Sequence, residues 1–437
     1  MKYYSTNKNT PTVSLKEAVV KGLAPDNGLF MPEHINKFEP SFFENIHNLS
    51  FQEIAYEVAF KFFGDDIESS TLKAIVYDTL AFDSPVVKVA DNIYSLELFH
   101  GPTMAFKDVG ARFMARLLSH FMTDREKQVN VLVATSGDTG SAVANGFLDV
   151  EGIHVYVLYP KGKVSKIQES QFTTLERNIT ALEIDGTFDD CQQLVKSAFL
   201  DKELNEALVL TSANSINVAR FLPQAFYYFY AYAQLQKLGV LNDRSLVFSV
   251  PSGNLGNITA GLFAEKMGLP IHHFVAANNA NRVVYDYINF GEYTPRPSIE
   301  TIANAMDVGT PSNFARILDL YHHTYAEIIH MIKSVTYSDE EIRETIKKVY
   351  DDYGYLCDPH GACGFRALEE TLNDEEVGVF LETAHPAKFL ETMEQVLGVG
   401  KVELPAKLSE FMRGEKRSIL LDNQFTTFKK YLLNNSI

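Results

Sequence analysis

Residues 245–268 read SLVFSVPSGNLGNITAGLFAEKMG, which is a short apolar run, a loop with two glycines and a helical pattern. A continuous apolar run such as 245–250 is typical of a strand buried on both faces. The same order recurs twice, because residues 129–135 precede SGDTG and a helical pattern, and residues 377–381 precede ETAHP and another. Buried strands that alternate with helices predict a mainly parallel sheet, so the expected fold class is α/β.

Other segments fit the same architecture. Residues 153–159 and 271–277 are further candidates for buried strands, and residues 217–239 and 338–353 have long helical patterns. The second of these helices opens with SDEE, where the serine can cap the helix and the acids meet the positive end of its dipole. Ligands in open α/β sheets bind beyond the carboxyl ends of the strands, so the three loops above are the expected place for a functional site.

The boundaries between lobes are weakly marked. With 437 residues the chain is too long for one ordinary core. We expect a helical and mixed N-terminal segment at 1–83, where PDNGLFMPE forms a cluster of turn residues. For the remainder we predict a larger lobe made of 84–128 with 221–437, and a smaller lobe at 129–220.

Composition argues against several classes of protein. The formal net charge of −17 disfavours binding to a nucleic-acid backbone, which needs a concentrated positive face. No apolar stretch approaches the ~20 residues that a membrane-spanning helix needs. The polar start MKYYSTNKNT has no secretory signal core. We therefore expect a cytoplasmic protein that has neither membrane nor nucleic-acid partners.

The three cysteines, Cys191, Cys357 and Cys363, form no CxxC pair and no disulfide framework. We expect them to be small core or near-site thiols. The sequence also contains no HExxH and no cysteine–histidine zinc spacing, so it predicts no metal site.

The loop PSGNLGN is a candidate phosphate site. Gly253 and Gly256 allow the backbone to approach a ligand closely, and Asn254 and Asn257 tolerate left-handed conformations. The helix that follows offers backbone amides and a positive dipole end, which suit a phosphate monoester. No Lys-Ser or Lys-Thr follows the glycines, so this is not a nucleotide-binding P-loop. A tight turn without a ligand stays open as the alternative.

The segment HGPTMAFKD contains a candidate Schiff-base lysine. A strand-like run at 93–99 leads into a Gly-Pro turn, and a helical pattern begins near Lys107. The positive end of the helix dipole and the apolar neighbours Met104, Ala105 and Phe106 all disfavour an ammonium group. Both effects favour the neutral, nucleophilic amine that a Schiff base requires. The alternative is an ordinary solvated lysine at a helix start.

The other two loops offer anion-binding and polar groups. TSGDTG places hydroxyls and backbone donors at a helix start, which suits a carboxylate, although simple helix capping would also explain it. In ETAHPAKF, Thr383 is a neutral hydroxyl at a strand end, and His385 and Lys388 could face the same cleft. The role of His385 stays open.

Taken together, these motifs resemble the threonine synthases of the long bacterial and fungal type. The resemblance begins at YYST and SLKEAVVKGLAPDNGLFMPE, continues through HGPTMAFKD, TSGDTGSA and PSGNLGN, and ends at LETAHPAKF, so it covers almost the whole chain. It implies the fold type II, tryptophan synthase β-like architecture of pyridoxal-phosphate (PLP) enzymes, with two mainly parallel-sheet lobes. It also implies PLP as the cofactor.

The resemblance implies a role for each motif. Lys107 would bind PLP as a Schiff base, and Thr383 would approach the pyridine nitrogen. The residues expected to bind the cofactor phosphate are Gly253, Asn254, Leu255, Gly256 and Asn257. Those expected to bind the substrate carboxylate are Thr135, Ser136, Gly137, Asp138 and Thr139. Dehydratase relatives usually carry Ser-x-Gly-Asn at this loop whereas this chain has Ser-Gly-Asp, which leaves the role of Asp138 open.

The implied reaction converts O-phospho-L-homoserine and water into L-threonine and phosphate, with PLP as the electron sink. Lys163 and Lys166 in KGKVSK are our hypothesis for part of the substrate-phosphate site, and two solvated lysines are the alternative. A serine or threonine dehydratase-type PLP lyase and a non-catalytic phosphate-binding homologue remain alternative functions. The resemblance favours a monomer.

Overall fold

The computed structural model describes residues 1–122, 128–242 and 244–435. The chain divides into two compact units. Unit 1 comprises Met1, 32–106 and 221–403, and unit 2 comprises 2–31, 107–220 and 404–437. None of the helices within the described ranges combines the length and the apolar character needed to cross a bilayer.

Unit 1 is built on a mainly parallel sheet. Its described strands lie in the order β12-β11-β10-β13-β5-β4, and only the edge pair β4–β5 is antiparallel. The bounds are β12 (Ile332–Thr336), β11 (His273–Asn278), β10 (Ser245–Pro251), β13 (Glu376–Glu382), β5 (Ile93–Glu97) and β4 (Val86–Ala90). The central strands are buried along almost their whole length, as their continuous apolar runs predict.

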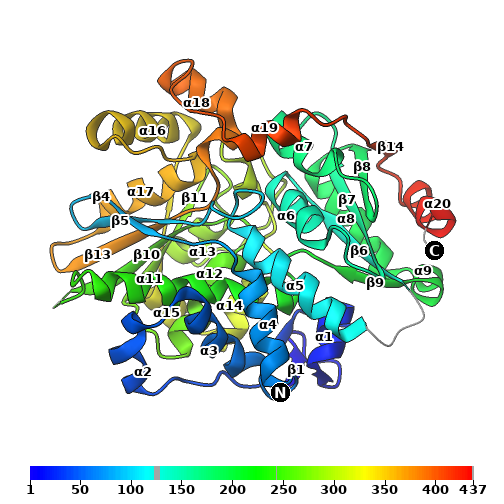
Figure 1. Ribbon diagram of the computed structural model, residues 1–437, viewed down its shortest axis with the longest axis horizontal. Coiled ribbons are helices and arrows are strands. Elements are labelled where there is room, and N and C mark those ends of the chain that lie inside the picture. Colours follow the sequence, from blue (N-terminus) through cyan, green and yellow to red (C-terminus); the bar gives the residue numbers. More distant parts are fainter. Residues whose placement is uncertain (123–127, 243, 436–437) are drawn as a thin grey trace. The chain divides into compact units, whose positions relative to one another are not determined.

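Helices cover both faces of this sheet. Phe248 of β10 contacts Tyr228 of α11 (Ala225–Lys237), whereas the next residue, Ser249, faces Gly364 of α17 (Pro359–Thr371). Consecutive strand residues point to opposite faces, so α11 and α17 pack on opposite sides, as Figure 1 shows. The other helices of unit 1 are α2 (Pro40–Asn45), α3 (Phe51–Phe63), α4 (Ser69–Thr79), α12 (Gly256–Lys266), α13 (Val283–Phe290), α14 (Phe314–Leu320), α15 (Tyr325–Met331), α16 (Asp339–Tyr353) and α18 (Leu390–Leu397).

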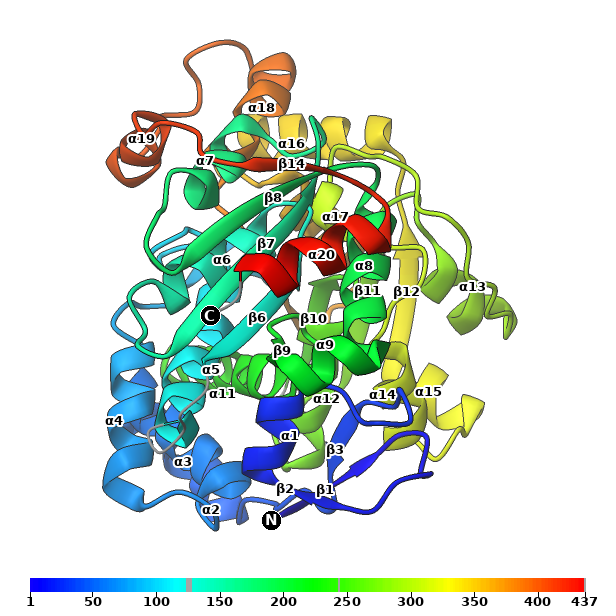
Figure 2. The ribbon, with the colours of Figure 1, turned by 90° about the vertical axis from the view of Figure 1, so that its right-hand side faces the viewer.

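Unit 2 contains a second parallel sheet. Its described strands lie in the order β14-β8-β7-β6-β9, and every neighbouring pair is parallel. The bounds are β14 (Ile419–Asp422), β8 (Ile179–Asp185), β7 (Ile153–Pro160), β6 (Val129–Ala134) and β9 (Val209–Ser212). One face of this sheet packs on α8 (Phe188–Leu200) and α20 (Phe425–Asn435), which lie side by side in Figure 2.

The remaining elements of unit 2 include a small N-terminal sheet in the order β2-β1-β3. These strands are β1 (Lys2–Ser5), β2 (Val13–Ser14) and β3 (Phe30–Pro32), whose last residue belongs to unit 1. The helices are α1 (Leu15–Lys21), α5 (Lys107–Met122), α6 (Asp138–Phe147), α7 (Lys166–Thr173), α9 (Lys202–Ala207), α10 (Val218–Phe221) and α19 (Ala406–Met412). Short 3₁₀ turns are η1 (Ile46–Asn48), η2 (Leu222–Gln224), η3 (Asn304–Met306) and η4 (Pro386–Phe389).

The predicted α/β class with mainly parallel sheets is confirmed, and one predicted helix is wrong. Residues 217–239 do not form a continuous helix, because α10, η2 and α11 follow one another there. Pro223 lies in the 3₁₀ turn and has no backbone N–H for a helical hydrogen bond, which explains the interruption. The predicted helix 338–353 is confirmed as α16, and Ser338 and Glu341 form a capping box at its start.

The compact units differ from the predicted lobes in where the N-terminal segment belongs. Residues 2–31 group with unit 2, because the Val19 carbonyl accepts hydrogen bonds from Thr211 Oγ1 (3.2 Å) and Asn217 Nδ2 (2.9 Å). The predicted lobe segment 84–128 includes residues 123–127, which lie outside the described residues. The functional lobes 1–83, 84–128 with 221–437, and 129–220 stay a prediction.

Candidate active site

The glycine loop connects β10 to α12 in unit 1. Gly253 packs so closely on a neighbouring segment that a Cβ atom would lie 2.7 Å from the Ala305 carbonyl oxygen and 2.9 Å from Met306 Cα. Leu255 has a φ of 62°, a left-handed conformation that costs a leucine roughly 1 kcal/mol or more. The loop is therefore held in a tight path that its sequence alone would not favour.

Asparagine side chains brace this loop. Asn257 Nδ2 donates to the Pro251 carbonyl at 2.9 Å, which closes the loop on itself. Asn254 Oδ1 accepts the Ser312 amide at 2.6 Å, and Asn313 Nδ2 donates to the Asn254 carbonyl at 2.8 Å. These hydrogen bonds hold the backbone of the glycine loop in place.

The start of α12 fits a phosphate group. The N-cap residue of this helix, Leu255, has no side chain that could cap it, and Asn257 Oδ1 accepts the Ile258 amide at 2.9 Å. The first amides of an α-helix have no partner within the helix, and the dipole there favours an anion. The braced loop and the start of this helix therefore offer backbone amides that suit a phosphate monoester.

The end of β13 is tied to the segment that precedes Lys107. The Phe106 amide donates to the Thr383 carbonyl at 2.9 Å, and the His385 amide donates to the Met104 carbonyl at 3.1 Å. Ala105 and Ala384 form an isolated antiparallel bridge between these two contacts. The backbone of Thr383 is therefore hydrogen-bonded directly to Phe106, the residue that precedes Lys107.

His385 and Lys388 support this pairing. The Nδ1 atom of His385 accepts the Ala387 amide at 3.1 Å. Burial, and to a smaller extent the charge of His100, lowers the pKa of His385 to about 4. Lys388 is buried, and its Nζ donates to the Thr103 carbonyl at 2.9 Å. The contacts of both side chains hold the turn in place.

Lys107 is the first residue of α5, as predicted. The buried Arg220 donates from its guanidinium to the Lys107 carbonyl (3.1 Å) and to the Ala213 carbonyl (2.7 Å). Gly110 allows this close packing, because a Cβ there would lie 2.4 Å from the Arg220 carbonyl oxygen. Arg220 thus fixes the turn of α5 that begins with Lys107.

The TSGDTG loop connects β6 to α6 in unit 2. Thr135 is buried, and its Oγ1 accepts the amides of Gly137 (2.9 Å) and Gly140 (2.7 Å). Asp138 is buried as well, and its carboxylate accepts a hydrogen bond from Gln168 Nε2 at 2.9 Å. Thr135 and Asp138 therefore shape the loop, and a bound carboxylate would use the remaining donors at this helix start.

Lys163 and Lys166 are both exposed, and Lys166 begins α7. The three cysteines are buried and form no disulfide. Burial raises the pKa of each of these thiols, so none is a ready nucleophile. All three are therefore core thiols, which is one of the two predicted placements.

Sequence reasoning missed a buried acidic cluster beside Thr383. Glu382 and Asp358 are both fully buried, and the Asp358 amide donates to the Glu382 carboxylate. Burial and then the Asp358 charge raise the pKa of Glu382 well above its ordinary value. The sequence feature nearest to this cluster is the DPHG run (358–361). A Cβ on its Gly361 would clash with the Glu382 carboxylate.

Comparison with known proteins defines the class. A family model described as pyridoxal-phosphate dependent enzyme matches residues 82–381. Diaminopropionate ammonia lyase from Escherichia coli shares the fold at a TM-score of 0.56 and 14% identity, over 84% of this chain and 95% of that one. The protein is a PLP-dependent enzyme of fold type II, and its cofactor is PLP.

Further matches narrow the class. Family models for the threonine synthase N terminus and C-terminal region match residues 2–80 and 361–432. Threonine synthase of Haemophilus influenzae is 43% identical over 435 residues and 100% of both chains. The structures of threonine synthase from Escherichia coli (TM-score 0.94, 42% identical, 100% of both chains) and of the PLP-bound enzyme from Brucella melitensis (0.91, 34%, 100% and 99%) also match. The chain belongs to the threonine synthase family, and its activity is that of a threonine synthase.

Proposed function

We propose that this chain performs its reaction, the conversion of O-phospho-L-homoserine and water into L-threonine and phosphate, with Lys107 as the lysine that holds PLP and transfers protons. One observation carries the assignment. Lys107 begins α5 directly after a segment whose Phe106 amide is bound to the carbonyl of Thr383, at the carboxyl end of β13. This is the end of the strands at which α/β sheets bind ligands.

PLP, when bound, supplies the electron withdrawal that makes protons on the substrate carbons acidic. The Lys107 amine would take the α-proton and then the β-proton from the substrate. Arg220 would keep the amine in place through the Lys107 carbonyl. A single positioned amine can serve several proton transfers, so no second strong base is required.

The backbone of Gly253, Asn254, Leu255, Gly256 and Asn257 would bind the cofactor phosphate. The start of α12, with Leu255 at its N-cap, and the hydrogen bonds of Asn254 and Asn257 support this role. Thr383 would place a neutral hydroxyl near the pyridine nitrogen. Unlike an aspartate, a threonine would not force that nitrogen to carry a proton.

The substrate would be held by the loop of Thr135, Ser136, Gly137, Asp138 and Thr139 at its carboxylate. The start of α6, whose N-cap residue is Gly137, supplies the backbone donors for this role. Lys163 and Lys166 would supply part of the site for the substrate phosphate, which must differ from the site of the cofactor phosphate.

The chain would act as a cytoplasmic monomer. Three buried cysteines without a disulfide support a reducing compartment. Light scattering coupled to size-exclusion chromatography tests the monomer. A mass near the 49.1 kDa of one chain is expected, and twice that value would contradict it.

Measuring phosphate and threonine together tests the reaction. Purified protein given O-phospho-L-homoserine should release both products in equal amounts. A dehydratase would instead release ammonia and a keto acid from serine or threonine and no phosphate. A non-catalytic homologue would give neither set of products.

A further inference from the structure

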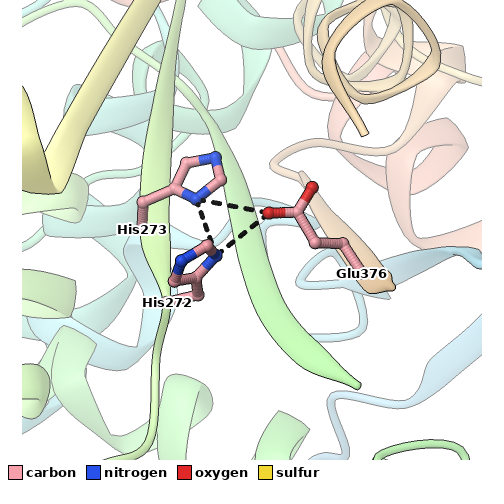
Figure 3. Close-up of side chains that lie close together, drawn as sticks. All are labelled: His272, His273 and Glu376. Atoms are coloured by element: carbon pink, nitrogen blue, oxygen red, sulfur yellow. Dashed lines mark hydrogen bonds and ion pairs between the residues drawn. The ribbon is translucent and has the colours of Figure 1, made fainter. Parts of the chain in front are cut away.

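Two histidines and a glutamate meet at the end of the unit 1 sheet opposite to the glycine loop. His272 immediately precedes β11, His273 is its first residue, and Glu376 is the first residue of β13. Strand β10 lies between these strands, and its Leu246 carbonyl accepts the His272 amide at 2.8 Å. Figure 3 shows the three side chains pointing toward one another.

The three donor atoms are spaced for a metal ion. His272 Nδ1 lies 3.0 Å and His273 Nδ1 lies 3.7 Å from the same carboxylate oxygen of Glu376. The two Nδ1 atoms are 3.3 Å apart. A tetrahedral zinc ion with bonds of 2.0–2.1 Å separates its ligand atoms by about 3.3–3.4 Å. The three atoms thus match one face of a zinc tetrahedron in size.

The surroundings orient the carboxylate and admit an ion. The Glu376 side chain is only 4% exposed, and its other oxygen accepts the Asn373 amide at 3.1 Å. Such a second contact fixes a ligand for a metal. The His272 side chain is 56% exposed, which leaves a path from solvent.

The nearby charges act in both directions. Burial lowers the pKa of His273, and the Glu376 charge opposes this effect. The neighbouring His272, Lys333 and His330 also lower the pKa of His273. The Lys333 ammonium would repel a bound cation, whereas the Glu376 carboxylate would attract it.

We propose that His272, His273 and Glu376 bind one divalent transition-metal ion of the zinc type. Two imidazoles and one carboxylate suit zinc, nickel or copper, whereas magnesium and calcium prefer oxygen ligands. The ion would link the amino ends of β11 and β13 and would stabilise the sheet. It takes no part in the chemistry, because the seven residues of β10 separate it from the glycine loop by about 20 Å.

Calorimetric titration of the tag-free holoenzyme with Zn²⁺, after dialysis against a chelator, tests the proposal. One Zn²⁺ should bind per chain, and Mg²⁺ should not bind at this site. His272→Ala should weaken Zn²⁺ binding at least about tenfold. The exposed His34 lies outside the cluster, so His34→Ala is the matched control and should bind as the wild type does.

A second readout separates binding from damage to the fold. Zn²⁺ should raise the Tm of the wild type and of His34→Ala, but not that of His272→Ala or Glu376→Gln. Circular dichroism and the cofactor absorbance show whether these variants are folded. Equal Zn²⁺ affinity in the wild type and both cluster variants would overturn the proposal, since the ion would then be held elsewhere, for example by the cofactor. Absence of binding would overturn it as well.

Discussion

Strand β13 begins and ends with a buried glutamate, and the groups that face the two carboxylates differ. Glu376, at the amino end, faces His272 and His273. Glu382, at the carboxyl end, faces Asp358, and its pKa is raised well above the ordinary value by burial and by that second acid. The same residue type therefore faces two imidazoles at one end of the strand and a second acid at the other.

The two ends of this parallel sheet carry groups that suit different tasks. The carboxyl ends of β10 and β13 carry a braced loop and a turn tied to the Lys107 segment. The amino ends carry side chains suited to an ion. Substitutions at Lys107 or in the glycine loop should therefore change the reaction, whereas substitutions at the amino ends of these strands should change only stability and ion binding.

The largest effect is expected for Lys107. Lys107→Ala removes the amine that holds PLP and transfers protons, so kcat should fall roughly 10³-fold or more. Lys107→Arg should be equally inactive, because a guanidinium stays protonated. The exposed Lys37 provides the control, and Lys37→Ala should keep wild-type turnover. Turnover of Lys107→Ala near the wild-type value in the phosphate-release assay would refute the role of this lysine.

The next effect concerns Gly253. A Cβ there would meet backbone atoms of Ala305 and Met306, so the loop of Gly253→Ala must shift. Overpacking of this kind costs about 1–3 kcal/mol, which corresponds to roughly 5- to 150-fold weaker PLP binding. Fluorescence titration of the apoenzyme with PLP measures this constant.

Gly354 offers the matched control for Gly253. It ends α16 in a left-handed conformation with open space around it. Gly354→Ala should lower the free energy of unfolding by about 1 kcal/mol and leave PLP affinity unchanged. Equal PLP affinity in Gly253→Ala and Gly354→Ala would show that the glycine loop does not bind the cofactor.

A smaller effect is expected for Glu382. Its pKa is raised in the folded state, so the stability that its protonated form contributes is present below the ordinary pKa and is lost as pH rises through the folded pKa. Glutamine does not ionise. The Tm of Glu382→Gln relative to wild type should therefore increase from pH 5 to pH 9, with turnover at neutral pH within about threefold. A Tm difference that stays constant over this range would show that the Glu382 carboxyl is not held neutral.

The smallest effect on the reaction is expected at Glu376. Glu376→Gln lies at the far end of the strand, so kcat/KM should stay within about twofold of wild type. A tenfold loss in a folded variant with normal PLP absorbance would show that the two ends of the sheet are coupled, contrary to the comparison.

Much of this architecture could be predicted from the sequence, because local signals carry it. Apolar runs mark the buried strands, and HGPTMAFKD and PSGNLGN are each complete within a few residues. Pro223 is a local signal for the interruption between α10 and α11, but the apolar pattern continues on both sides of it and predicts a single helix.

The rest depends on contacts between distant residues. His272 and Glu376 are 104 residues apart, and Asp358 and Glu382 are 24 apart, so no local pattern brings either pair together. The grouping of residues 2–31 with unit 2 depends on hydrogen bonds from Thr211 and Asn217. Such polar contacts leave no periodic trace in a single sequence.

Borohydride reduction of the PLP-bound protein, followed by digestion and mass spectrometry, tests the central assignment most directly. Reduction fixes the lysine–PLP bond, and Lys388 is a demanding internal comparison because it is buried and donates to the Thr103 carbonyl. The account predicts the pyridoxyl mass on the peptide that contains Lys107 and an unmodified Lys388. Modification of Lys388 or another lysine, with Lys107 unmodified, would contradict it.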